Sequence, residues 1–203
     1  MGTGIGIVAA RHSGINVKFV DPSEKQLTFA SNMVTKWCDK EIAKERLTEV
    51  EKKSVIERIS YGDAISHLND VDFVVEAATE NFDLKKKIFQ DLASTTPDHA
   101  ILASNTSSIS ITKIGGCIPD RAHQVIGMHF MNPVPVMKLI EIIKGLQTDD
   151  HTLSTTLALA DSMKKTCTTS RDTPGFIANR VLIPYINEAV YALYEGIGTV
   201  EDI

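Results

Sequence analysis

The sequence predicts an α/β protein: a Rossmann-like, doubly wound, mostly parallel sheet followed by the first helix of an all-helical domain. Two observations carry this prediction. Short runs of branched apolar residues alternate with longer amphipathic segments along most of the chain. That order is typical of a largely parallel sheet covered on both faces. An early strand also ends in an acidic residue, Asp21, about 20 residues after a glycine cluster, as in dinucleotide-binding folds.

The elements of the first domain are expected in a regular order. A helix over residues 5–10 precedes a strand over 16–20, and the next helix begins after Pro22 with Ser23 near its N-terminus. Residues 59–61 are assigned to no element. Further strands are expected at 73–76, 100–104, 124–130 and 136–143, with a short extended piece at 167–169. Further helices are expected at 48–58, 63–68, 84–93 and 149–163, with a helical turn after Ser108.

A break containing proline and glycine separates this region from a longer helix. The domain boundary is placed near Asp172, which gives a first domain of residues 1–171 and the start of a second in residues 172–203. The last helix is expected from about residue 176 to residue 195, with a kink at Pro184 and an end at Gly196.

Composition excludes several classes of protein. With 203 residues, 43% of them hydrophobic and 23% charged, the chain is typical of soluble globular proteins. The formal net charge of -5 argues against nucleic acid as a partner, and no apolar run approaches the roughly 20 residues of a membrane helix. The three cysteines have neither a metal-ligand spacing nor a disulfide pattern. We therefore expect a soluble intracellular protein with no metal.

Polar clusters follow the ends of four expected strands. They lie at Asp21 and in residues 76–81, 104–108 and 129–132. Since ligands of such sheets bind beyond the carboxyl ends of the strands, these clusters are expected to share one rim and one crevice.

A histidine and a glutamate, His129 and Glu141, lie within two expected strands joined by a proline-containing turn. A carboxylate that bonds one imidazole nitrogen fixes its tautomer and stabilises the protonated ring, so the pair suits a general base. On their own, the two residues favour the structural alternative of a hydrogen-bonded core histidine and an edge-strand glutamate.

The glycines at positions 2, 4 and 6 resemble a phosphate-binding loop, but that motif requires a preceding strand. Gly2 is therefore interpreted as the third glycine of a G-x-G-x-x-G motif whose first strand is missing from this chain. Asp21 would then bond a ribose 2′-hydroxyl, which favours NAD over NADP. Without that strand, we expect an unstable fold or weak NAD binding.

Several motifs together resemble one known family. They are Asp21, VVEAATEN at 74–81, ASNTSS at 103–108, GMHFMNPVP at 127–135 and DTPGFIANR at 172–180. In this order they resemble the L-3-hydroxyacyl-CoA dehydrogenases of fatty-acid β-oxidation, including the 3-hydroxybutyryl-CoA dehydrogenases. The resemblance implies NAD-dependent oxidation of the 3-hydroxyl of an acyl-CoA, in a chain shortened at both ends. It also implies a homodimer for the full-length family, though not necessarily for this chain, in the mitochondrial matrix, a peroxisome or the cytoplasm.

The resemblance also implies roles for individual residues. His129 is the base and Glu141 its partner, Ser107 bonds the reacting oxygen beside the nicotinamide, and Asn179 positions the substrate. The implied cofactor contacts are Gly2, Asp21, Glu80, Lys85, Asn105, Ser107 and Asn132. Lys44, with Lys36 and Lys40 at helical spacing, would meet the phosphates of coenzyme A.

Each of these roles has a structural alternative. Ser107 could cap a helix, Asn179 could be a polar surface residue, and the charged residues could be solvated. Two other functions also remain open: a dehydrogenase of a non-CoA hydroxy acid, such as a gulonate dehydrogenase, and a catalytically silent interaction protein.

Overall fold

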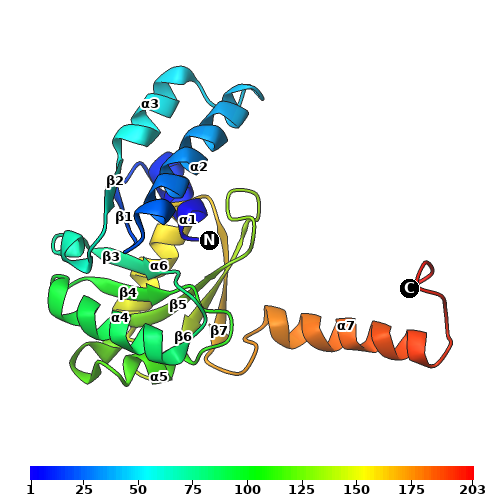
Figure 1. The fold of residues 1–203 in the computed structure, drawn as a ribbon. Coiled ribbons are helices and arrows are strands. Elements are labelled where there is room, and N and C mark those ends of the chain that lie inside the picture. Colours follow the sequence, from blue (N-terminus) through cyan, green and yellow to red (C-terminus); the bar gives the residue numbers. More distant parts are fainter.

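The computed structural model describes residues 1–203 and contains seven strands (Figure 1). The first half comprises α1 (Gly2–Val8), a π-helical turn (Ala9–Ser13), β1 (Val17–Val20), α2 (Glu24–Ile42), α3 (Glu49–Glu57), β2 (Ile59–Gly62), a 3-10 turn (Ile65–Leu68), β3 (Phe73–Glu76) and α4 (Phe82–Thr95). The second half comprises β4 (Ile101–Ser104), α5 (Ile111–Gly115), a 3-10 turn (Pro119–Gln124), β5 (Val125–Phe130), β6 (Leu139–Lys144), α6 (Asp150–Ser162), β7 (Thr166–Arg171) and α7 (Ala178–Tyr194).

The strands form two sheets. Five of them lie in the order β3-β4-β5-β6-β7, with β3, β4 and β5 parallel, β6 antiparallel to β5, and β7 parallel to β6. β1 and β2 form a separate parallel pair, and no strand lies between β1 and β3. The predicted Rossmann-like, mostly parallel architecture is confirmed, but its strands form two separate sheets instead of one.

Helices cover both faces of the larger sheet, as the alternation of strand side chains requires. On one face, Ile126 and Met128 of β5 pack in a core with Ile5 of α1 and Ala160 of α6. On the other face, the core contains Leu102 of β4 with residues of α4 and α5: Phe89, Leu92, Ile111 and Ile114. The sheet is therefore doubly wound.

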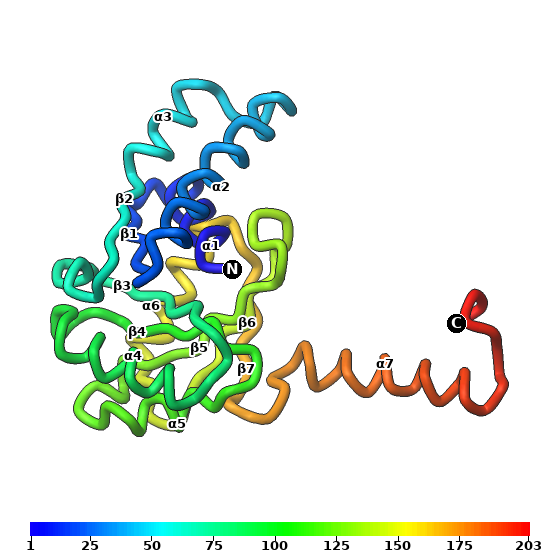
Figure 2. Tube along the Cα trace, in the orientation of Figure 1, coloured from blue at the N-terminus to red at the C-terminus, as the bar shows by residue number.

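The helical hairpin α2–α3 packs against α1 and against the small sheet formed by β1 and β2, as Figures 1 and 2 show. Val34 and Cys38 of α2 and Val55 of α3 are buried against Ile7 and Ala10. Thr48 begins α3 with a capping box, in which its side chain accepts from the Glu51 amide and the Glu51 carboxylate accepts from the Thr48 amide. The hairpin therefore has a core and a defined turn of its own.

Two differences from the expected elements have a clear physical reason. Residues 59–62 form β2; Ser60 and Tyr61 are exposed, so the segment lacks the apolar alternation that indicates a strand. The last helix begins at Ala178 instead of Phe176. Gly175 and Phe176 both have positive φ, and this bend turns the Phe176 ring back into the core.

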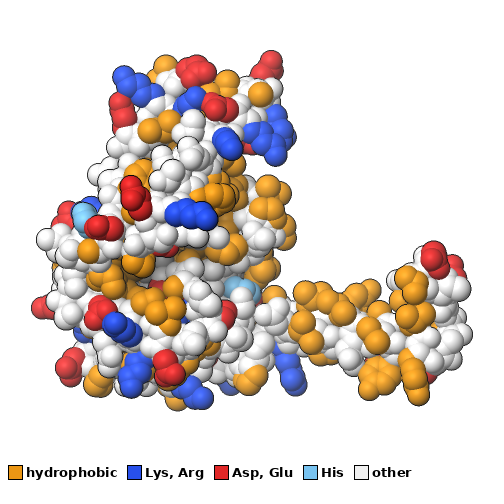
Figure 3. Space-filling view, viewed as in Figure 1, with side chains coloured by type: hydrophobic (Ala, Val, Ile, Leu, Met, Phe, Trp, Pro, Cys, Tyr) orange, Lys and Arg blue, Asp and Glu red, His pale blue; other side chains and the backbone are white.

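α7 extends away from the rest of the molecule (Figures 1 and 2). It has no buried residue, and apolar side chains lie exposed along it (Figure 3). Pro184 lies within the helix, and Gly196, with a φ of +72°, follows its last turn as expected. Across the molecule, none of the helices has the length and apolarity that crossing a membrane requires.

Candidate active site

His129 and Glu141 face each other across the β5–β6 ladder. They are direct partners in this antiparallel pairing, and their side chains are 9% and 0% exposed. The Nδ1 atom of His129 lies 2.9 Å from Oε2 of Glu141. Because a carboxylate only accepts, Nδ1 carries the hydrogen, and Nε2 is left with a lone pair that can accept a proton. The pairing of β5 with β6 thus brings the two predicted residues, His129 and Glu141, into contact.

Ser107 completes this arrangement from the loop after β4. Its hydroxyl lies 3.1 Å from Nε2 of His129, and its backbone amide donates to the Glu80 carboxylate. Glu80 also accepts from the Thr106 hydroxyl at 2.8 Å. The carbonyl of Ser107 lies 3.4 Å from the Asn179 amide nitrogen at the start of α7. The structure thus brings together five of the predicted residues: His129, Glu141, Ser107, Glu80 and Asn179.

Lys85 has a different environment from the one expected of a cofactor contact. Its side chain is 1% exposed, and its Nζ donates to both oxygens of Glu76, at 2.7 and 2.9 Å, and to the Ala78 carbonyl. Glu76 in turn accepts from the Ser104 hydroxyl at 2.7 Å and from the Ala78 amide. Because these acceptors occupy the three donors of the ammonium, Lys85 acts by holding the loop that carries Glu80.

Glu141 also connects the sheet to the last helix. While Oε2 accepts from His129, Oε1 accepts from the backbone amides of Ile177 and Ala178, at 2.9 and 2.8 Å. These amides belong to the first turn of α7 and would otherwise lack partners. The same carboxylate therefore orients the imidazole and fixes the start of α7.

Two asparagines lie near the end of β5 in different environments. Oδ1 of Asn105 accepts from the Phe130 amide at 2.8 Å, which ties the loop after β4 to the end of β5. Asn132 is exposed in the following turn, and its side chain makes no hydrogen bond. Lys165 stabilises this turn by donating to the carbonyls of Val134 and Met137. Burial lowers the pKa of Lys165.

The remaining predicted residues lie farther along the molecule. Asp21 follows β1, and one of its oxygens accepts from the Ser23 amide at 2.9 Å, which leaves the other oxygen free. Gly2 is the first residue of α1, where an added Cβ would meet only an ordinary contact; the close approach is at Gly6, whose Cβ would lie 2.2 Å from the Phe19 ring. Lys44 is exposed in the turn after α2, so the helical lysine stripe ends at Lys40.

Sequence reasoning placed residues 76–81 and 104–108 at the rim but assigned no role to the buried residues among them. Glu76, Ser104 and Thr106 form hydrogen bonds beneath the loops after β3 and β4, and the amides of Ile177 and Ala178 donate to Glu141. Glu76 gave one usable signal: an acidic residue that closes an apolar strand needs a partner if it is buried. The amides gave none, since their role depends on the bend before α7.

The residues at the rim fit a bound dinucleotide. The free oxygen of Asp21 and the carboxylate of Glu80 can accept from ribose hydroxyls, while the amide nitrogen of Asn105 keeps its donors. A Rossmann-like sheet with a paired imidazole and carboxylate at its rim defines the class of nicotinamide-dependent dehydrogenases.

Comparison with known proteins identifies the family within this class. Residues 1–173 match the 3-hydroxyacyl-CoA dehydrogenase NAD binding domain, and residues 175–203 match the 3-hydroxyacyl-CoA dehydrogenase C-terminal domain. The chain belongs to the 3-hydroxyacyl-CoA dehydrogenase family, so the resemblance of its motifs is confirmed.

Individual relatives agree with this assignment. A probable 3-hydroxybutyryl-CoA dehydrogenase of Bacillus subtilis is 44% identical over 203 residues, which cover 100% of this chain and 70% of that protein. The 3-hydroxybutyryl-CoA dehydrogenase of Bradyrhizobium diazoefficiens is 41% identical over 100% of this chain and 69% of its own length. The crystal structure of (S)-3-hydroxybutyryl-CoA dehydrogenase from Ralstonia eutropha superimposes with a TM-score of 0.96 at 45% identity, covering 100% of this chain and 71% of that one.

Proposed function

We propose that this protein catalyses the NAD-dependent, reversible oxidation of an L-3-hydroxyacyl-CoA to a 3-oxoacyl-CoA, with His129 as the general base. The observation that carries this proposal is the line of groups from Ser107 through His129 to Glu141, joined by contacts of 3.1 and 2.9 Å. The line supplies a hydroxyl donor, a proton acceptor and a buried carboxylate in the order that oxidation of an alcohol requires.

Each group has a distinct part in the proposed reaction. The Nε2 lone pair of His129 takes the proton of the 3-hydroxyl, and Oε2 of Glu141 stabilises the imidazolium that forms. The Ser107 hydroxyl donates to the substrate oxygen, and Asn179 contacts the substrate from the start of α7. NAD accepts the hydride when it is bound. Asp21, Glu80, Asn105 and Asn132 contact the cofactor, with Gly2 beside its phosphates and Lys85 holding Glu80 in place.

The domain organisation follows from the same proposal. Residues 1–171 bind the cofactor and residues 172–203 begin the helical domain, with Glu141 joining the two parts. The exposed apolar side chains of α7 support a further proposal, that this helix is covered in the active enzyme by more helical structure or by a second subunit.

The test is oxidation of NADH in the presence of acetoacetyl-CoA. We expect turnover with acetoacetyl-CoA, and a decrease in kcat/KM of about 10²–10⁴-fold in His129→Gln, because His129 gives its proton to the substrate oxygen in this direction and general acid–base catalysis contributes on that order. The control is Lys86→Gln, which removes an exposed charge of α4 and should leave turnover unchanged. Turnover of sugar acids alone would indicate a non-CoA dehydrogenase. A folded protein that turns over neither substrate would indicate a silent interaction protein, and each of these results contradicts the proposal.

A further inference from the structure

The bend before α7 contains a bulky residue in an unfavourable backbone conformation. Phe176 has a φ of +48°, and Gly175 before it has a φ of +80°. Glycine adopts positive φ at no steric cost, but the same φ strains a residue with a large side chain. Strain of this kind persists only where the surrounding structure enforces it, and it is frequent beside active sites. The contacts of the Phe176 side chain are therefore of functional interest.

The Phe176 ring is buried against the imidazole of His129. Phe176 is 3% exposed and belongs to the core that contains Ile111 of α5 and Ile143 of β6. Its ring lies edge-on to the ring of His129, with 6.1 Å between the ring centres and 61° between the ring planes. This distance and angle are those of a favourable edge-to-face aromatic contact.

The backbone after Phe176 reaches the other member of the pair, Glu141. The next two residues, Ile177 and Ala178, donate their amides to Oε1 of Glu141 at 2.9 and 2.8 Å, while Oε2 accepts from His129. The strained bend thus places an aromatic ring against the imidazole and two amides against the carboxylate.

We propose that Phe176 is a positioning residue for the general base, an inference that rests on the proposed function. His129 is held at its two nitrogens, by Glu141 at 2.9 Å and by Ser107 at 3.1 Å. Hydrogen bonds at the nitrogens do not keep water from the ring, whereas a buried aromatic ring packed against it does. Phe176 therefore keeps the imidazole in one orientation and prevents water from competing for the Glu141 carboxylate, which strengthens the bond between the two residues.

The exclusion of water has its largest effect when His129 takes the substrate proton and becomes positively charged. Attraction between the imidazolium and the Glu141 carboxylate is stronger in a medium of low dielectric constant. Phe176 stabilises this state without contacting the substrate. Its loss should therefore lower kcat and leave KM for the acyl-CoA unchanged.

Phe176→Leu tests the aromatic contact alone, because leucine stays apolar and keeps the strain of positive φ but has no ring. Phe176→Met, whose flexible side chain can fill the same space, is the second variant in case Phe176→Leu does not fold.

The first readout is the proton NMR resonance of the Nδ1 hydrogen of His129, recorded without substrate and assigned by its absence in His129→Gln. In wild type this hydrogen is bonded to Glu141 and shielded from water, so it should give a low-field resonance. In Phe176→Leu it should exchange with water, and the resonance should be lost.

The second readout is the kinetics of L-3-hydroxybutyryl-CoA oxidation by NAD. We expect kcat to fall by about 10–10²-fold in Phe176→Leu, because a small misplacement of a catalytic group costs on this order. KM for the acyl-CoA should not change, which separates a positioning role from a role in substrate binding.

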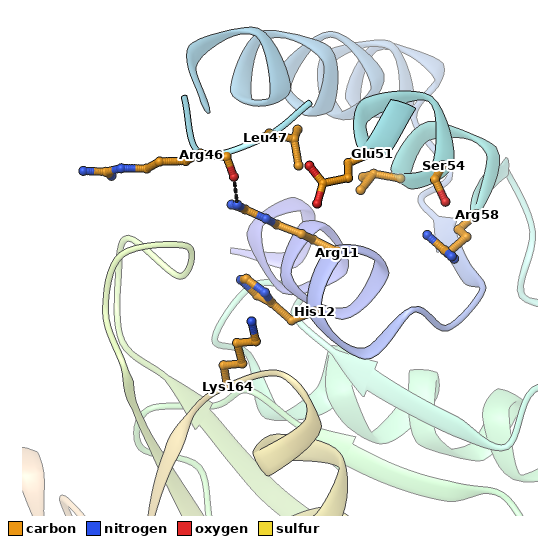
Figure 4. Close-up of a pocket in the computed structure, with 9 residues that line it drawn as sticks. Arg11, His12, Arg46, Leu47, Glu51, Ser54, Arg58 and Lys164 are labelled. Atoms are coloured by element: carbon orange, nitrogen blue, oxygen red, sulfur yellow. Dashed lines mark hydrogen bonds between the residues drawn. The ribbon is translucent and has the colours of Figure 1, made fainter. Parts of the chain in front are cut away.

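Arg11, at the far end of the α1 segment from Gly2, provides a control for general loss of stability. Its guanidinium donates to the Arg46 carbonyl at 2.5 Å (Figure 4), approaches Glu41 at 3.4 Å, and lies 5.1 Å from the centre of the Trp37 ring. It lines a separate cavity of about 450 Å³, none of whose lining residues forms a hydrogen bond with His129. Arg11→Gln should therefore lower the melting temperature but leave the resonance and kcat unchanged.

The proposal is overturned if wild type lacks the resonance, or if the folded Phe176 variant keeps it with the wild-type exchange rate. It is also overturned if an active Phe176 variant keeps kcat within about twofold of wild type, or if Arg11→Gln shows the same losses. A wild-type protein that shows the resonance but does not oxidise the acyl-CoA would contradict the proposed function instead. The resonance in Phe176→Leu would then decide the positioning role, because it needs no substrate.

Discussion

The ion pair between Lys85 and Glu76 is the most deeply buried pair of charges in the site. Their side chains are 1% and 2% exposed, and every donor of the ammonium has an acceptor. A buried charge that loses its partner is strongly destabilising, whereas a solvated one is not. The sequence shows lysines at 85, 86 and 87, and the family resemblance singled out Lys85 only as a cofactor contact. Only the packing of α4 against β3 makes one of them structural, so this role could not be predicted from the sequence.

We expect Lys85→Met to destabilise the fold by about 3–5 kcal/mol, because it leaves the Glu76 carboxylate buried without a counter-charge. Lys86→Met on the exposed side of the same helix should change stability by no more than about 0.5 kcal/mol. Urea denaturation measures both. Equal stability of the two variants would show that the buried pair contributes nothing.

At the scale of elements, α5 depends on a residue far away in the sequence. Asp172 follows β7 and accepts from the Ser110 hydroxyl at 2.6 Å and from the amides of Ile111 and Thr112 at 3.1 and 2.8 Å. It thus supplements Ser110, the N-cap of this five-residue helix. The sequence identified Asp172 only as a domain boundary, because a cap that comes from 60 residues away leaves no local pattern.

The pKa of Asp172 gives this contact a pH dependence. Burial alone would raise this pKa, but hydrogen bonds from Ser110, Thr112 and Ile111 lower it overall. A carboxyl with a lowered folded-state pKa stabilises the fold above its unfolded pKa, near 3.9, and loses this contribution as the pH falls through the folded value.

Asp172→Asn should therefore lower the free energy of unfolding at pH 7 by about 1–2 kcal/mol, because an amide cannot accept the same three hydrogen bonds. The difference from wild type should shrink as the pH falls below about 4. Thermal denaturation across this range tests the expectation, with Asp120→Asn, an exposed aspartate, as the control. A difference that stays constant from pH 7 to pH 3 would contradict it.

Other elements were predictable where their signal is local in the sequence and were missed where it depends on distant residues. Strands with continuous apolar runs, such as β4 and β5, were predicted within one residue, because full burial on both faces requires that composition. β2 was missed because its two middle residues are exposed and its pairing with β1 is non-local. The pair of His129 and Glu141 was predictable because one residue lies on each side of a single turn; the contacts of Glu141 with α7 were not.

At the scale of the whole molecule, the two sheets are unequally protected. All four residues of β1 are half-buried, whereas all six of β5 are buried, and no ladder of hydrogen bonds connects the two sheets. The small sheet and its helical hairpin are joined to the rest mainly through α1 and its π-helical turn, which contacts α6 through Ser13 and Ser162 at 2.8 Å.

Hydrogen exchange should reflect this division. We expect the amides of β1 and β2 to exchange faster than those of β4 and β5, because local opening costs least where burial is incomplete. Mass spectrometry of peptides from 17–20 and 125–130 provides the comparison. Equal protection of the two segments would show that the molecule opens as one unit.

The central claim is that Glu141 sets the His129 tautomer that accepts the substrate proton. In Glu141→Gln, Oε1 can still accept from the Ile177 and Ala178 amides, so the start of α7 should be preserved. The new amide group, however, donates to Nδ1 of His129, which moves the ring hydrogen to Nε2 and blocks its lone pair.

The most direct measurement is kcat/KM for oxidation of L-3-hydroxybutyryl-CoA by NAD, the direction in which His129 accepts the proton, in Glu141→Gln and in wild type, with their melting temperatures recorded in parallel. We predict a loss of about 10²–10⁴-fold in kcat/KM with little change in melting temperature. A variant that retains kcat/KM within twofold of wild type would contradict the account.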